Sequence, residues 1–245
     1  MPDLPPPYVH AIDISVDTKC DIYVGIDFGT TYSAIAWSRP TTETDLLKIA
    51  ASISTVKQWP GGANTEKIRT VLSYDVDPPR WGAMVQREHE PQVELFKLGL
   101  QEKLGSYYLI GGGQSNHSPY LTNHEWRHPK LPRKAAVDHV ADYLTQIRKF
   151  FVETYLKRQF DLGQSGQNLK IGYVLTVPAI WSDKAKELTR RAATMAGLER
   201  RQLTLVAEPE AAALYCATKC PDANLKDGDV FLVCDAGGGT VVEGS

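Results

Sequence analysis

Two short segments of the chain combine a carboxylate, glycine and a hydroxyl at similar spacing. The first is Asp27-Phe-Gly-Thr-Thr31, and the second, 208 residues later, is Asp235-Ala-Gly-Gly-Gly-Thr240. Glycine lets the backbone approach a phosphate, whose oxygens accept hydrogen bonds from peptide N–H groups. Aspartate can hold Mg²⁺, often through water that the ion retains. One such loop is more often a plain turn, whereas two matched loops predict a site that grips phosphate from both sides.

The apolar runs around the first loop predict a set of antiparallel strands. Residues 22–28 and 32–38 are apolar and flank Gly29-Thr-Thr31, which is typical of a hairpin with its turn at the glycine. Residues 46–53 and 68–74 are the next strand candidates. The first loop is therefore expected at the end of a hairpin.

The elements that follow alternate between helix and strand. Apolar residues three, four and seven positions apart predict a long helix over 135–159. Ser182 or Asp183 is expected to open another helix that closes at Gly197. The remaining candidates are a helix over 92–104, strands over 171–177, 203–206 and 230–235, and a helix over 210–218. This order predicts an α/β fold, with a mixed sheet and helices on both faces.

Composition and charge narrow the class of protein. Of the 245 residues, 42% are hydrophobic and 23% are charged, which is typical of a globular protein. A formal net charge of -2 gives no electrostatic footprint for nucleic acid or an anionic membrane, so neither is expected as a partner. Residues 1–20 contain Pro5-Pro-Pro7 and lack the pattern of a signal peptide, which predicts a flexible tail and a cytoplasmic protein.

Two further motifs favour structural interpretations over chemical ones. Cys216 and Cys220 would share a helix face, but no third or fourth ligand is near in sequence, so idle or buried thiols are favoured over a metal site. The glycine run 111–113 precedes no helical pattern and no lysine, and is interpreted as a loop. The chain contains no Gly-x-x-x-x-Gly-Lys-Ser/Thr motif, which argues against a P-loop enzyme.

Four motifs, in order along the chain, resemble the heat-shock-70 chaperones. They are the first phosphate loop (25–33), the stretch before the second loop (175–179, Asp183 and 196–198), the Glu-Pro motif (206–214) and the second phosphate loop (233–240). The variants Val-Pro-Ala-Ile-Trp-Ser-Asp183 and Cys-Asp-Ala-Gly-Gly-Gly239 resemble a divergent heat-shock-70-like branch more than the abundant chaperones.

The resemblance implies an actin-like (ribonuclease H-like) ATPase fold cut short at the start of its second lobe. The expected domains are the tail over 1–20, a first lobe over 21–227, and the first strand and phosphate loop of an incomplete second lobe over 228–245. The last strand would then lack most of its sheet. We expect it to borrow a sheet edge, pair with another copy or be poorly ordered.

The resemblance also implies a role for each matched residue. Asp27 and Asp235 would lie at Mg²⁺, and Glu208 would position the attacking water. Lys97 is the candidate for the family's lysine near the γ-phosphate, the alternative being one charge on a surface helix. The phosphates of ATP or ADP would be bound by Gly29, Thr30, Thr31 and Tyr32 from one loop and by Gly237, Gly238, Gly239 and Thr240 from the other.

The sequence departs from the family at two positions of this site. Val242 stands where the family typically has an aspartate at the metal centre. Lys186 stands where it has an arginine that relays the nucleotide state, and a lysine lacks the planar fork of that arginine. Both departures bear on whether the chain hydrolyses ATP.

Three functions are weighed on these grounds. The first is ATP binding and hydrolysis to ADP and phosphate with Mg²⁺, coupled in the intact family to folding of protein clients with co-chaperones through regions beyond this chain. The second is a catalytically inactive half-domain that serves as an interaction module or is a truncated gene product. A sugar or acetate kinase shares the fold, but the Val-Pro-Ala and Glu-Pro motifs favour chaperones. The isolated chain is expected to bind ATP weakly, with no turnover above background.

Overall fold

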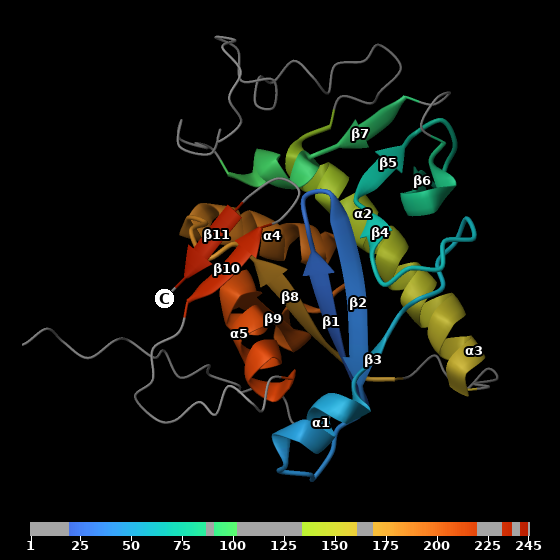
Figure 1. The fold of residues 1–245 in the computed structure, drawn as a ribbon. Helices are drawn as coiled ribbons and strands as arrows, with labels where there is room; N and C mark the ends of the chain where they lie inside the picture. The colour runs from blue at the N-terminus through green and yellow to red at the C-terminus, as the bar shows by residue number, and fades with distance from the viewer. Residues whose placement is uncertain are drawn as a thin grey trace, which may run out of the picture.

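The described part of the chain is built around one mixed sheet (Figure 1). The computed structural model describes residues 20–86, 91–101, 134–160, 169–219, 232–236 and 241–244. The strands of the sheet are β1 (Ile22–Phe28), β2 (Tyr32–Ser38), β3 (Ser54–Thr55), β4 (Ile68–Arg69), β8 (Ile171–Val177) and β9 (Leu203–Ala207). Their order is β3-β2-β1-β8-β9, with β4 also paired to β2. β1 runs antiparallel to β2 and parallel to β8, and β8 runs parallel to β9.

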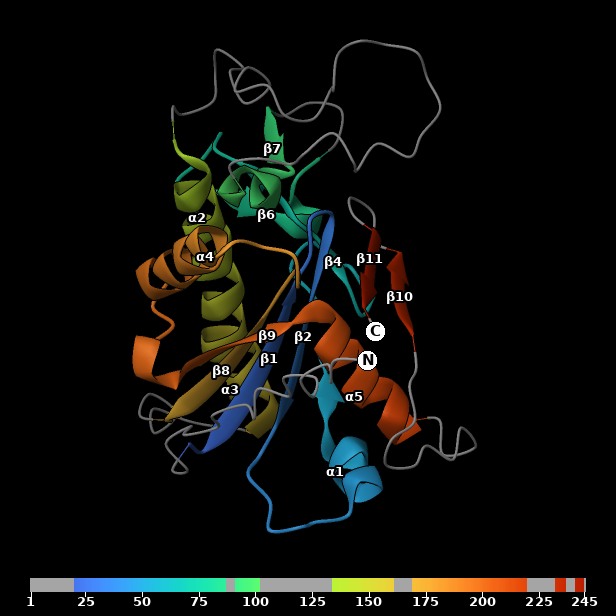
Figure 2. The same ribbon diagram turned by 90° about the vertical axis from the view of Figure 1, so that its left-hand side faces the viewer.

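Helices cover both faces of this sheet (Figure 2). On one face lies a continuous helical segment formed by α2 (Ala136–Lys149), π-helical turns over Phe150–Tyr155 and α3 (Leu156–Phe160), together with α4 (Asp183–Met195). On the other face lie α1 (Leu46–Ser52) and α5 (Glu208–Lys219). None of the helices in the described part of the chain is long and apolar enough to cross a lipid bilayer.

The two faces of β1 differ in burial, and this difference positions the site. Ile22, Val24, Ile26 and Phe28 are buried in the core against α2, as the period of two in a strand requires. The residues between them, which include Asp27, are less buried and point to the opposite face. Asp27 therefore stands outside the core, on the face that α5 shares.

Two smaller sheets flank the main one. β5 (Val71–Ser73) pairs with β6 (Arg80–Trp81) and β7 (Gln92–Glu94), and 3-10 helices follow at Gly82–Met84 and Phe96–Leu100. A third 3-10 helix, Arg200–Gln202, precedes β9. β10 (Val233–Ala236) and β11 (Val241–Gly244) form a two-stranded antiparallel sheet that packs against α5.

Most long elements match their sequence prediction. The predicted hairpin is formed by β1 and β2, β8 covers the predicted 171–177, and the helix expected over 135–159 is the segment from α2 to α3. The hydroxyl of Ser182 caps α4 by accepting from the N–H of Ala185 at 3.3 Å. Gly197 ends that helix with a φ of +82°.

Two predicted elements are wrong. Residues 46–53 were expected to form a strand, but 46–52 are helical because the carboxylate of Asp45 accepts from the N–H groups of Leu47 and Lys48 and caps α1. The helix expected over 92–104 is instead strand β7 and a 3-10 helix. The break between them falls at Leu95, whose φ of +58° is incompatible with a continuous helix.

The end of the chain also differs from expectation. α5 begins at Glu208, two residues before the predicted start. Three outcomes were expected for the last strand. Within the described residues β10 pairs with β11 and not with an edge of the main sheet, so the prediction of a borrowed edge is wrong, and pairing with another copy stays a prediction. The predicted tail before Cys20 and the glycine run 111–113 lie outside the described residues.

Candidate functional site

The first glycine loop is a tight turn between β1 and β2. A Cβ atom at Gly29 would overlap the carbonyl oxygen of Tyr32, so the turn can close only with glycine at this position. Thr30 is buried, whereas Tyr32 is 46% exposed. The side chain of Thr30 is therefore packed inside the turn, whereas that of Tyr32 projects from its end.

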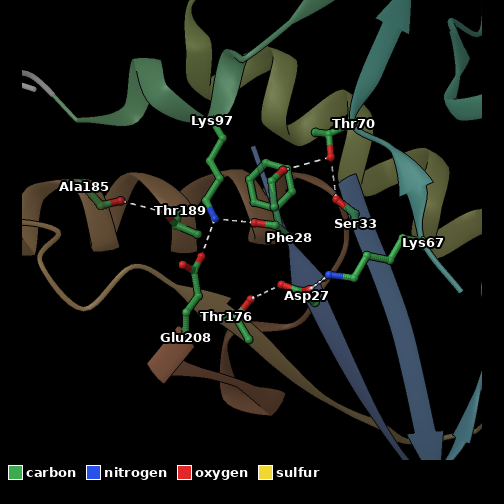
Figure 3. A network of polar contacts seen from close by, with 11 residues as sticks. Asp27, Phe28, Ser33, Lys67, Thr70, Lys97, Thr176, Ala185, Thr189 and Glu208 are labelled. Carbon is green, nitrogen blue, oxygen red and sulfur yellow. Dashed lines mark hydrogen bonds and ion pairs between the residues drawn. The ribbon is translucent and has the colours of Figure 1, made fainter. Parts of the chain in front are cut away.

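Thr70 holds this turn from the neighbouring segment. Its N–H donates to the carbonyl oxygen of Thr31 at 2.8 Å, and its hydroxyl donates to that of Gly29 at 2.9 Å. The hydroxyl of Ser33 lies 2.9 Å from the same oxygen of Thr70, and both side chains are buried (Figure 3). The sequence analysis missed Thr70, because only the pairing of β4 with β2 brings it to the loop.

Lys97 is buried at the end of β1, so it is not a charge on a surface helix. Its ammonium donates to the carbonyl oxygen of Phe28 at 2.5 Å and to Oε1 of Glu208 at 2.6 Å (Figure 3). The residue is 2% exposed. A buried lysine needs such partners, since an unpaired ammonium in a protein interior is strongly unfavourable. The rings of Phe28 and Trp181 lie 5.4 and 5.6 Å from Nζ and add cation–π contacts.

Glu208 reaches Lys97 from the junction between β9 and α5. It is the first residue of the helix, and its side chain is 13% exposed. The positive end of the helix dipole favours a carboxylate at this position. Lys97 and Glu208, predicted separately from motifs far apart in sequence, are thus in direct contact beside the first loop.

Asp27 lies beside this pair on the exposed face of the sheet. Its Oδ1 accepts from the hydroxyl of Thr176 at 3.2 Å, and its Oδ2 lies 3.7 Å from the ammonium of Lys67 (Figure 3). The carboxylate is 45% exposed and so is accessible from solvent. Thr176 lies within the motif at 175–179 but was given no role there, and Lys67 belongs to no motif.

The second loop has the strand framework of the first. Asp27 pairs across its hairpin with Ala34, and Asp235 pairs across its own with Val242, the residue seven positions later in both cases. Gly237, Gly238, Gly239 and Thr240 lie outside the described residues. The two aspartates therefore occupy equivalent register positions in two hairpins.

These residues fit a magnesium-bound nucleotide phosphate. Gly29 permits the tight turn at the end of β1, Lys97 supplies a buried cation, and Asp27 supplies an accessible carboxylate. No group of three or more His, Cys, Asp or Glu side chains among the described residues could hold a metal by itself. Mg²⁺ does not require one, because it commonly binds one or two carboxylates and completes its shell with water and phosphate oxygens.

Comparison with known proteins identifies a family that the chain resembles over part of its length. Residues 145–242 match the family described as Hsp70 protein. This chain is a distant homologue of the Hsp70 proteins. The match implies the actin-like ATPase fold of the Hsp70 family, and the mixed sheet with helices on both faces agrees with the fold class predicted from the sequence.

Two Hsp70 relatives match most of the chain, and a third matches a short part of it. Human heat shock 70 kDa protein 12A is 27% identical over an alignment of 214 residues, which covers 80% of this chain and 28% of that protein. Chaperone protein DnaK of Thermosipho africanus is 28% identical over 222 residues, which are 91% of this chain and 30% of that protein. Human heat shock 70 kDa protein 12B is 52% identical over 50 residues, 19% of this chain and 7% of that protein. The match to protein 12A confirms the predicted resemblance to the divergent branch. The chain spans less than a third of the length of these relatives.

Proposed function

We propose that this chain is the first phosphate-binding lobe of an Hsp70-type ATPase. The observation that supports this best is the buried contact of Lys97 with Glu208 and the Phe28 carbonyl, directly beside the Gly29 turn. A charged pair of this kind is costly to bury for stability alone. Its position at the end of a strand, next to a tight glycine turn, is typical of a site built for a phosphate.

Each residue would have a distinct task. The N–H groups and hydroxyls of Gly29, Thr30, Thr31 and Tyr32 would donate to the β- and γ-phosphates, and Lys97 would donate its ammonium to a γ-phosphate oxygen. Glu208 would accept a proton of the attacking water and orient its lone pair toward phosphorus. Asp27 would hold Mg²⁺ through water, and Asp235 would approach from the second loop. The bound ion would neutralise phosphate charge, which is the main requirement of phosphoryl transfer.

Binding of ATP, ADP and AMP in Mg²⁺ tests the proposal by calorimetry. We expect ATP and ADP to bind at least about tenfold more tightly than AMP, equivalent to about 1.4 kcal/mol, because the site would recognise the β- and γ-phosphates. Lys97→Gln should reduce the preference for ATP, since it removes the buried ammonium. Lys57→Gln is the matched control, because Lys57 is 64% exposed and paired with Glu66 at 3.0 Å.

A phosphate-release assay distinguishes an active lobe from an inactive one. Val242 lies opposite Asp235, where a further carboxylate would help to hold the metal, and this favours an inactive lobe as the second candidate function. Phosphate release that disappears in Glu208→Gln but persists in Glu210→Gln, on the exposed side of the same helix, would establish hydrolysis. Nucleotide binding without release would favour the inactive lobe. Equal affinity for ATP and AMP would contradict phosphate recognition altogether.

A further inference from the structure

Asp27 belongs to a row of residues that crosses the exposed face of the sheet. It lies opposite Ala34 on β2, and Ser33 on β2 lies opposite Ile68 on β4. Continuing that antiparallel register by one residue places Lys67 opposite Ala34. On the other side, β8 runs parallel to β1 and brings Thr176 beside Asp27. The row therefore reads Lys67, Ala34, Asp27 and Thr176.

The small side chain in the middle of the row lets its charged members meet. Neighbouring strands are about 4.8 Å apart, so Lys67 must reach across roughly 10 Å of sheet to contact Asp27. The methyl group of Ala34 leaves that path open, and Nζ of Lys67 reaches Oδ2 of Asp27 at 3.7 Å (Figure 3). Thr176 engages the other oxygen of the carboxylate. The ammonium of Lys67 thus lies near the carboxylate oxygen of Asp27 that Thr176 does not contact, and it offsets the negative charge of the carboxylate.

The ion pair between Lys67 and Asp27 is exposed to solvent, so each partner can exchange it for another ionic contact. The side chains of Lys67 and Asp27 are 63% and 45% exposed, and exposed pairs of this kind contribute little to folding. The lysine is nevertheless held in place at its backbone, because its carbonyl accepts from the hydroxyl of Thr65 and β4 follows it at once. Because the backbone of Lys67 is held while its side chain is exposed, its ammonium can move from one anionic partner to another.

We propose that the side chain of Lys67 serves as a permanent cation of the proposed phosphate site, present whether or not a metal ion is bound. It neutralises Asp27 when no metal is bound, and it donates to a phosphate oxygen of a nucleoside polyphosphate when Asp27 turns to Mg²⁺. This inference rests on the proposed function of the site. Charge repulsion favours the exchange, because an ammonium and a divalent ion repel each other when both lie at the same carboxylate, and the displaced ammonium stays within reach of the bound anion.

The proposal predicts that ATP binding tolerates the loss of divalent metal. We expect the dissociation constant of ATP for the wild-type chain to rise no more than about tenfold when Mg²⁺ is replaced by EDTA. In Lys67→Gln the rise should be about tenfold larger, because neither cation then faces the phosphates. Lys57→Gln, which alters another exposed lysine in an ion pair, should behave as the wild type.

Metal binding without nucleotide gives a second readout. Mn²⁺ titration followed by electron paramagnetic resonance should show a several-fold tighter site in Lys67→Gln, because the competitor for Asp27 has been removed. Asp27→Asn should abolish that site.

Unchanged Mn²⁺ affinity in Lys67→Gln would overturn the inference and leave the proposed function intact. The same would follow if the ratio of ATP affinities in Mg²⁺ and EDTA were the same in Lys67→Gln as in the wild type. Failure of the wild-type chain to bind ATP in Mg²⁺ would overturn both.

Discussion

At the scale of single residues, the first loop owes its shape to buried polar groups. Ser33, Thr70 and Lys97 are all at most 2% exposed, and each has a partner on or beside the turn. Burying a polar group is tolerable only when its hydrogen bonds are formed, so each of these side chains fixes the conformation in which its bonds exist. The conformation of the loop is therefore fixed without a ligand, which would lower the ordering cost of the phosphate binding that we propose.

Thr70→Val tests this positioning role. The change keeps the shape of the side chain but removes the donor to the Gly29 carbonyl, and we expect a loss of about 1–3 kcal/mol in the free energy of unfolding. ATP affinity should fall as well, because the turn is no longer held. Thr70→Ser retains the hydroxyl and should recover most of the affinity. Urea denaturation and calorimetry measure the two effects, and Val and Ser variants with the same ATP affinity would refute the role.

At the scale of elements, a polar cluster joins β5 to α2. The hydroxyl of Tyr74, just after β5, donates to Asp142 at 2.7 Å and lies 2.7 Å from Nδ1 of His139. Lys134 donates to the same carboxylate at 2.5 Å. Further along α2, the hydroxyl of Tyr143 donates to the carbonyl of Arg69 at 3.0 Å, which ties the helix to β4. α2 thus supports the segment that carries both Thr70 and Lys67.

This cluster gives the packing of α2 a dependence on pH. Burial, opposed by the charge of Asp142, lowers the pKa of His139 to about 4 from its ordinary value of 6.5. The folded state therefore excludes a proton that the unfolded state binds below pH 6.5, so stability falls as the pH drops from about 6.5 to 4. We expect a loss on the order of 2 kcal/mol over that range. Chemical denaturation at a series of pH values should show a flatter profile for His139→Gln, and identical profiles would contradict the assignment.

At the scale of the whole molecule, sequence patterns located elements better than they located contacts between elements. β8 and α4 were predicted because their apolar periods and the Ser182 and Gly197 ends are local signals. α1 was mistaken for a strand because its run is short and apolar, and the capping signal at Asp45 was overlooked.

The contacts of the site depend on pairing that no local pattern encodes. Lys97 and Glu208 could be named from motifs, but their contact depends on β7 and the following 3-10 helix lying over the end of β1. Lys67 and Thr70 belong to no motif. They reach the loop only through the register between β4 and β2.

The main sheet and the two-stranded sheet of β10 and β11 should differ in stability. β8 is paired on both sides within the main sheet, whereas β10 and β11 pair with each other in a two-stranded sheet next to the exposed Leu232. A two-stranded hairpin is marginal by itself. We expect amide exchange, followed by mass spectrometry, to be at least about tenfold faster over 233–236 and 241–244 than over 171–177. Equal protection of the two regions would show that contact with α5 holds the small sheet as firmly as the core.

The contacts of Lys97 also have a kinetic consequence. Its two hydrogen-bond partners lie 69 and 111 residues away along the chain. Contacts between such distant residues form slowly, because the loops they close must first lose their conformational freedom. The pair can close only after the first hairpin, the segment over 92–100 and the junction of β9 with α5 have all come together. We therefore expect the proposed phosphate site to be completed only after these three parts of the chain have come together.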